Sequence, residues 1–134
     1  MPPDEASYFK DWLRIAEKDW KRVQMLLDED DPALAGFCLQ QAIEKFLKAY
    51  LLVKGWHLRR IHDLDTLLED AIHYDASLRS FQEACQKITA YYIVERYPFN
   101  MQNEITDDDI RNSRDQVKSL VEKIRNSLKT DPEE

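Results

Sequence analysis

The chain has 134 residues, the size of one ordinary domain, so we expect residues 1–134 to fold as a single unit around one core. It contains only two glycines and five prolines, and 34% of its residues are charged, so turn-forming residues are scarce. A small β-domain needs many turns, and an all-α fold is therefore favoured. The formal net charge of −7 disfavours a surface that grips nucleic acid everywhere, although a local basic patch is compatible with it.

Apolar residues recur at the spacing of amphipathic helices in the first half of the chain. This spacing predicts a helix from about residue 5 to 27 and a second helix over residues 32–54. Asp31 can cap the second helix, and Pro32 suits its first position. Gly55 stands where a glycine that ends a helix is expected.

The second helix has two further features. Ile43 and Leu47 widen its apolar stripe, so we expect it to contact neighbours on two sides. A bundle this small has limited means of covering both sides, which favours pairing of two copies as a homodimer. Lys48 and Lys54 are placed to favour the negative end of the helix dipole.

Three more helices follow. Asp63 can cap a short helix, and a fourth helix runs from about Ala76 to Arg96, because Pro98 disfavours a helical conformation at the residue before it. Thr106 and the three aspartates after it have the form of a capping box, which predicts the start of a fifth helix. Long helices with short joins predict an up-down bundle of four main helices plus a short helix.

Cysteine chemistry and membrane insertion have little support in the sequence. Cys38 and Cys85 lie inside apolar periodic segments, as expected for buried thiols in a reducing compartment. The N-terminus lacks a basic start followed by an apolar run, and no stretch approaches the roughly 18 apolar residues of a membrane span. We therefore expect a cytoplasmic protein.

Metal and cofactor chemistry also has little support. Four potential ligands recur at near-helical spacing: His62, Asp65, Glu69 and His73. Such a row is more often the polar side of an amphipathic helix than a metal site. With only two glycines, a glycine-rich phosphate loop is excluded, so we expect neither a metal nor a cofactor.

The first candidate binding segment lies at the end of the fourth helix, where Arg96 is surrounded by Tyr92, Tyr97 and Phe99. A planar guanidinium beside aromatic rings can bind a phosphate through two hydrogen bonds while a ring stacks on a base. The alternative is a cation that rests on the last carbonyls of its own helix, with the tyrosines in the core.

The second candidate is the loop over residues 54–62, the densest positive stretch of the chain, with Arg59, Arg60 and His62. A patch of this kind can steer an anionic ligand or an acidic partner. A solvated loop with cations near the end of a helix explains the same residues.

The sequence resembles the HEPN family, the higher eukaryotes and prokaryotes nucleotide-binding domain. Residues 37–50, FCLQQAIEKFLKAY, are similar to the signature helix of that family. Gly55, then His62-Asp63-Leu64, then Arg96-Tyr97-Pro98 follow in the family's order, so the resemblance covers nearly the whole chain. It implies four main helices plus a short one, a homodimer, and in prokaryotes a neighbouring minimal nucleotidyltransferase as partner.

Some branches of the family are metal-independent ribonucleases that act as toxins, with an arginine and a histidine separated by four to six intervening residues. This chain departs from that pattern. After Arg96 the corresponding positions hold Met101, Gln102 and Asn103, and no histidine occurs beyond His73. An imidazole that could act as general acid or base is therefore missing from its expected place.

We therefore expect an accessory HEPN-like module rather than an enzyme. It would bind a nucleotide or nucleic-acid phosphate or pair with a nucleotidyltransferase, in some cases in a toxin–antitoxin context. The expected ligand contacts are Arg96 and Tyr97, followed by Lys45, Arg59, Arg60 and His62. The alternative is a metal-independent HEPN ribonuclease with a non-standard active site, in which His62 or Tyr97 replaces the missing histidine.

Overall fold

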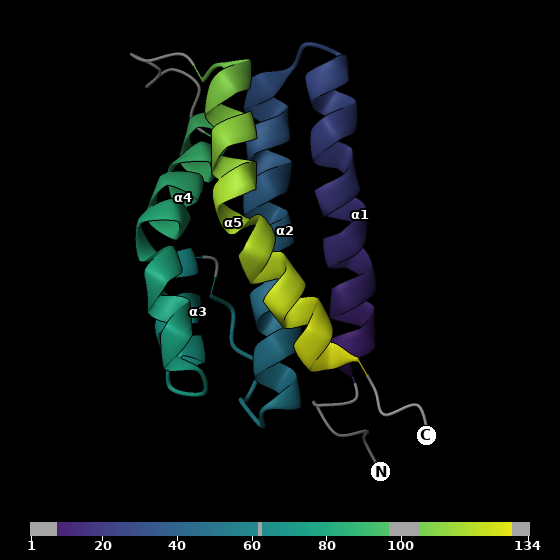
Figure 1. The fold of residues 1–134 in the computed structure, drawn as a ribbon. Coiled ribbons are helices and arrows are strands. Elements are labelled where there is room, and N and C mark those ends of the chain that lie inside the picture. The colour runs from purple at the N-terminus through teal and green to yellow at the C-terminus, as the bar shows by residue number, and fades with distance from the viewer. Residues whose placement is uncertain (1–7, 62, 97–104, 130–134) are drawn as a thin grey trace.

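The computed structural model describes residues 8–61, 63–96 and 105–129, and for residues 93–96 the backbone alone. Among these residues no strand occurs. The helical elements are α1 (Phe9–Asp28), α2 (Pro32–Val53), α3 (Leu64–Ile72), the 3-10 helix η2 (Ala76–Phe81), α4 (Gln82–Arg96) and α5 (Asp107–Leu128). Figure 1 shows α1 and α2 as an antiparallel hairpin, with α3 and α4 on the far side of α2 from α1. The predicted all-α bundle of four long helices and a short one is confirmed.

Local signals set both ends of α2 as predicted. The side chain of Asp31 accepts a hydrogen bond from the backbone N–H of Leu34 at 3.2 Å, and Pro32 occupies the first turn. At the other end Gly55 has a φ of 98°, the left-handed region that favours glycine. Gly55 and Trp56 both donate their backbone N–H groups to carbonyls of the last turn, which ends the helix.

The capping box at the start of α5 is also confirmed. The backbone N–H of Asp109 donates to Thr106 Oγ1 at 3.1 Å, and the backbone N–H of Thr106 donates to Asp109 Oδ2 at 2.9 Å. The side chain of Asp63 caps α3 through a 3.0 Å bond from the N–H of Asp65. Short polar side chains thus satisfy the first N–H groups of these helices.

The start of the fourth helix differs from the prediction. The segment begins as the 3-10 helix η2, and α-helical geometry starts only at Gln82. Asp75 accepts hydrogen bonds from both the backbone N–H and the hydroxyl of Ser77, and Ser80 Oγ donates to the Ser77 carbonyl. Such side-chain bonds compete with the α-helical pattern, which explains the tighter first turns.

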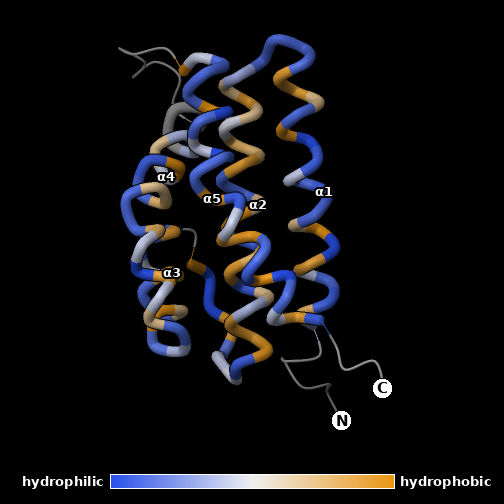
Figure 2. Tube along the Cα trace, viewed as in Figure 1, coloured by the Kyte–Doolittle hydropathy of each residue, from blue (hydrophilic) through white to orange (hydrophobic). Residues whose placement is uncertain are grey.

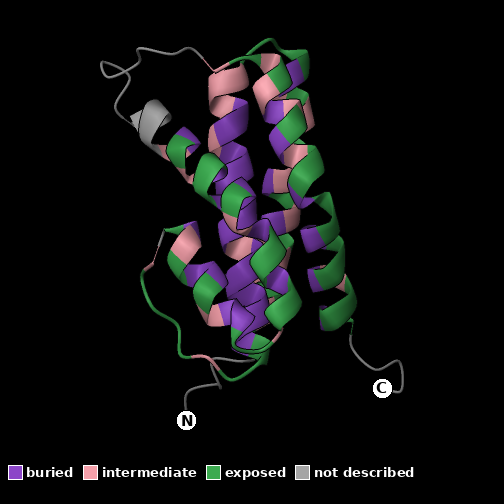
Figure 3. Cartoon of the chain, turned by 60° about the vertical axis from the view of Figure 1, so that its left-hand side comes forward, coloured by how far each residue is buried: buried purple, intermediate pink, exposed green. Residues whose placement is uncertain are grey.

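The core is organised around α2, which contacts α1, α3, α4 and α5. Apolar residues recur along every helix (Figure 2), and the buried segments lie at the centre of the bundle with exposed faces outside (Figure 3). Ile43 and Leu47 are 0% exposed within the single chain. The prediction that they leave an apolar face for a second copy is therefore wrong, because the other helices of the same chain already cover it.

α2 approaches its neighbours closely at Gly36. A Cβ atom at this position would lie 2.9 Å from Cδ1 of Ile110 and 3.1 Å from Cβ of Tyr91. Tyr91 is held in place because its hydroxyl lies 2.8 Å from Oγ of the buried Ser113. A glycine is therefore needed here for close packing and not for a turn.

The cysteines behave as predicted: Cys38 and Cys85 are both buried and unbridged. Burial raises the pKa of the Cys85 thiol to about 12, with a smaller contribution from the charge of Asp65. Such a thiol is a poor nucleophile. Among the described helices, none is long and apolar enough to cross a membrane.

Candidate functional site

Three polar side chains are buried on one face of α2. Gln40, Glu44 and Lys48 are 1%, 3% and 3% exposed and stand four residues apart, so they form a row along the helix. Gln40 Nε2 donates to Glu44 Oε1 at 3.1 Å, and Lys48 Nζ donates to Glu44 Oε2 at 2.9 Å. Two buried charges cost desolvation energy, and a well-packed apolar pair would often be as stable. The row is therefore a costly feature of α2 that apolar packing alone does not explain.

The Lys48 end of this row opens into a second feature, which we call the basic hollow. It has a volume of about 400 Å³ and is lined by Trp12, Lys48, Leu58, Arg59 and Arg60. Lys48 Nζ lies 5.1 Å from the centre of the Trp12 ring, within the range of a cation–π contact. An aromatic ring and three cations from α1, α2 and the loop after α2 therefore meet at one place.

The loop that carries the two arginines is anchored to α3. Arg59 Nη2 donates to Asp70 Oδ2 at 2.8 Å, and the indole N–H of Trp56 donates to the same oxygen at 3.0 Å. The guanidinium of Arg59 also lies 5.8 Å from the centre of the Trp56 ring. These contacts hold the loop against α3.

The charges of the basic hollow are not fully compensated. Glu44 balances Lys48, and Asp70 balances Arg59. Arg60 is exposed and makes no ion pair with a carboxylate in the described part of the chain. Among the described residues, one positive charge that lines the hollow is therefore without a carboxylate partner.

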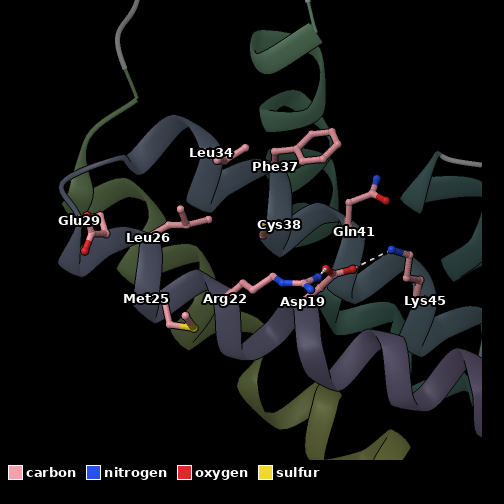
Figure 4. A pocket seen from close by; sticks show the side chains of 10 residues that line it. All are labelled: Asp19, Arg22, Met25, Leu26, Glu29, Leu34, Phe37, Cys38, Gln41 and Lys45. Carbon is pink, nitrogen blue, oxygen red and sulfur yellow. Dashed lines mark hydrogen bonds and ion pairs between the residues drawn. The ribbon is translucent and has the colours of Figure 1, made fainter.

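Lys45 lies in a different place from the two arginines. Its ammonium is 2.7 Å from Oδ2 of Asp19, and Arg22 Nη1 is 2.8 Å from Oδ1 of the same carboxylate. These three residues border a separate cavity of about 490 Å³ between α1 and α2, the α1–α2 hollow (Figure 4). Lys45 thus belongs to the contact between α1 and α2, and it is ion-paired.

The remaining predicted contacts lie elsewhere or outside the described residues. Arg96 is the last residue of α4, and nothing is described of its side chain; Tyr97 and His62 lie outside the described residues. One turn before Arg96, the Tyr92 ring stacks on Phe37 of α2 at 5.6 Å. Phe37 and Lys48 are separated by 11 residues of α2, about 16 Å along the helix. The predicted residues therefore do not form one cluster.

Lys48 and Trp12 are the residues that sequence reasoning missed. Its position near the end of α2 predicts that Lys48 favours the helix dipole, whereas the structure shows it buried and paired with Glu44. The four-residue spacing from Gln40 through Glu44 to Lys48 is the signal that could have identified the row, since it places three polar groups on one face of an otherwise apolar helix.

The row of possible metal ligands does not form a cluster in the described region, where no three His, Cys, Asp or Glu side chains are placed to hold a metal ion. His62 lies outside the described residues. Glu69 instead accepts a hydrogen bond from Gln82 Nε2 at 2.8 Å and joins α3 to α4. Desolvation and the nearby charges of Asp63 and Glu69 raise the pKa of Asp65.

Comparisons with known proteins place the chain in a family. A solved structure, the crystal structure of TT1696 from Thermus thermophilus, is similar with a TM-score of 0.79 and 27% sequence identity, covering 90% of this chain and 98% of that chain. No curated protein matches the chain. Residues 9–129 match the HEPN domain, so the match covers nearly the whole chain. The chain belongs to the HEPN domain family.

Proposed function

We propose that this HEPN domain binds the phosphate of a nucleotide or of RNA in the basic hollow. The observation that carries the proposal is the meeting of the Trp12 ring with Lys48, Arg59 and Arg60 around a cavity of about 400 Å³. Arginines recognise phosphate through two parallel hydrogen bonds, and an aromatic surface can stack on a base. The cavity volume falls within the range of roughly 300–1,000 Å³ that is usual for small-molecule sites.

Each residue has a distinct part in this proposal. Arg60 makes the primary phosphate contact, since its charge is uncompensated among the described residues. Arg59, held by Asp70, supplies a second, pre-oriented guanidinium. Lys48 and Trp12 form the floor, where a charge in a partly desolvated place acts more strongly than one in water.

Arg96 and Tyr97 can still contact the ligand if it is a single strand of RNA. The end of α4 lies near the N-terminal end of α2 (Figure 1), where Tyr92 stacks on Phe37, whereas Lys48 lies about three turns beyond Phe37 along α2. A mononucleotide is too small to reach both places, but a short RNA can follow the face of α2 between them. We therefore propose that Arg96 contacts only a ligand longer than one nucleotide.

Binding of two ligands tests these assignments. The affinities for adenosine monophosphate and for a short single-stranded RNA can be measured by isothermal titration. We expect Arg60→Gln to weaken both affinities by roughly tenfold or more, because a charge-assisted hydrogen bond is lost. Arg60→Lys should recover only part of the loss, because lysine keeps the charge without the bidentate fork. Lys118→Gln, which removes one exposed cation from α5, is the matched control and should leave both affinities unchanged.

Arg96→Ala separates the two ends of the surface. We expect it to weaken binding of the RNA and to leave binding of adenosine monophosphate unchanged. Equal affinities for Arg60→Gln and the unmodified protein would overturn the phosphate site. RNA cleavage in EDTA that Arg96→Ala abolishes would instead support the ribonuclease with a non-standard active site.

Protein partners are the second part of the proposal. We propose a homodimer that pairs with a minimal nucleotidyltransferase, in a toxin–antitoxin context, as the resemblance to the HEPN family implies. Light scattering should show a particle larger than the 15.9 kDa chain. A single 15.9 kDa species at micromolar concentration would contradict the homodimer.

A further inference from the structure

The α1–α2 hollow has the character of a ligand site that is separate from the basic hollow. Its volume is about 490 Å³, and its walls are mostly apolar. Met25 and Leu26 of α1 and Leu34 and Phe37 of α2 contribute to these walls (Figure 4), and Met25 is 58% exposed. Apolar cavities of this size with a few placed polar groups are typical of small-molecule sites.

Three charged side chains lie together at one end of this hollow: Asp19, Arg22 and Lys45. Asp19 is only 5% exposed, and its carboxylate lies between the Lys45 ammonium at 2.7 Å and the Arg22 guanidinium at 2.8 Å (Figure 4). Two cations therefore share one carboxylate, so this end of the hollow carries a net positive charge. Arg22 remains half-exposed and can turn its other N–H groups toward a ligand.

The opposite end has the opposite charge. Glu29 borders the hollow ten residues further along the chain than Asp19, about 15 Å away along the helix. A ligand in the hollow thus meets two cations at one end, apolar walls in the middle and a carboxylate at the other end. That order of groups favours a ligand with a negative charge at one end over a neutral ligand or one with negative charges at both ends.

We propose that the α1–α2 hollow binds a small amphipathic monocarboxylate. The carboxylate of the ligand would neutralise the excess positive charge of Arg22 and Lys45, and its apolar chain would pack against Met25 and Leu34. A second carboxylate at the far end of the ligand would face Glu29 and be repelled. A neutral ligand of the same shape would leave the extra cation without a partner.

Three ligands of equal chain length test the charge pattern. Isothermal titration with octanoate, octan-1-ol and octanedioate should give measurable binding for octanoate and affinities that are roughly tenfold or more weaker for the alcohol, because a charge-assisted hydrogen bond is lost. Octanedioate should also bind less tightly than octanoate. Equal affinities for octanoate and octan-1-ol, or no binding of octanoate at millimolar concentration, would overturn the proposal.

Variants locate the site. Arg22→Gln should weaken the affinity for octanoate by roughly tenfold and leave the affinity for octan-1-ol unchanged. Arg14→Gln, which removes an exposed cation elsewhere on α1, is the control and should change neither affinity. Leu34→Trp should fill the hollow and abolish binding of octanoate, with a thermal melt to show that the variant is folded. Unchanged octanoate binding in folded Leu34→Trp would overturn the assignment. It would also be overturned if the unmodified protein is a dimer and Leu34→Trp is a monomer, because a second copy of the chain would then occupy the hollow.

Discussion

Removal of the Lys48 charge should destabilise the fold far more than removal of an ordinary helix cation. Lys48 and Glu44 form an ion pair at 2.9 Å, with side chains 4% and 3% exposed. An exposed pair at this spacing contributes only about 0.3–0.5 kcal/mol, whereas loss of one partner from a buried pair costs about 3–5 kcal/mol. Gln40 still donates to Glu44 after the change, so we expect Lys48→Met to cost about 3 kcal/mol, the lower end of that range.

The double variant Glu44→Leu/Lys48→Met should recover most of that loss, because no charge is then left buried without a partner. Urea unfolding followed by circular dichroism measures both free energies of unfolding, with equal m-values as the check that the denatured states are comparable. Arg111→Met is the matched control, since Arg111 and Asp107 form a half-exposed pair at the same spacing, and its unfolding midpoint should change little. A cost below about 1 kcal/mol for Lys48→Met would refute the reasoning, because the pair would then behave as a surface pair.

Gly36→Ala should lower the free energy of unfolding by about 1 kcal/mol in urea titrations, because crowding against the fixed Tyr91 ring outweighs the gain in helix propensity; a stabilised variant would show that the contact relaxes freely. The backbone N–H and the hydroxyl of Thr106 lower the pKa of Asp109, so its contribution to stability is complete above the unfolded pKa of about 3.9 and is lost as the pH falls through the folded pKa. Thermal melts of Asp109→Asn should accordingly show a weaker loss of stability below about pH 4 than the unmodified protein, and parallel curves would contradict this. The Cys85 thiol, with a pKa of about 12, should react with a disulfide reagent at neutral pH only after unfolding, and fast reaction of the native protein would contradict its burial.

The helices and their ends were predictable because short-range signals determine them. The caps at Asp31, Asp63 and Thr106 and the turn at Gly55 each depend on residues within a few positions, and all four are found in the structure. The start of the fourth helix was not predictable in the same way. Its apolar spacing is helical, but hydrogen bonds around Ser77 tighten the first turns into η2.

The arrangement of the site depends on contacts that are distant in the sequence. Nothing near Lys48 indicates that Trp12, 36 positions earlier, covers it, or that Glu44 is buried with it. Lys45 was predicted to share a ligand with Arg59, but it is bound to Asp19 of α1. Tertiary packing decides which cations of α2 face each hollow, and periodicity along one helix does not contain that information.

The most direct test of the basic hollow is a titration of the isotope-labelled protein with adenosine monophosphate, followed by amide proton–nitrogen correlation spectra. The indole N–H groups of Trp12 and Trp56 and the backbone amides of residues 58–60 border the hollow or its loop, and we expect the largest shifts there. Trp20, whose ring packs against Phe46 in the core, provides an internal control that should not shift. Shifts confined to the surroundings of Phe37, or no shifts at millimolar nucleotide, would contradict a phosphate site formed by Arg59 and Arg60.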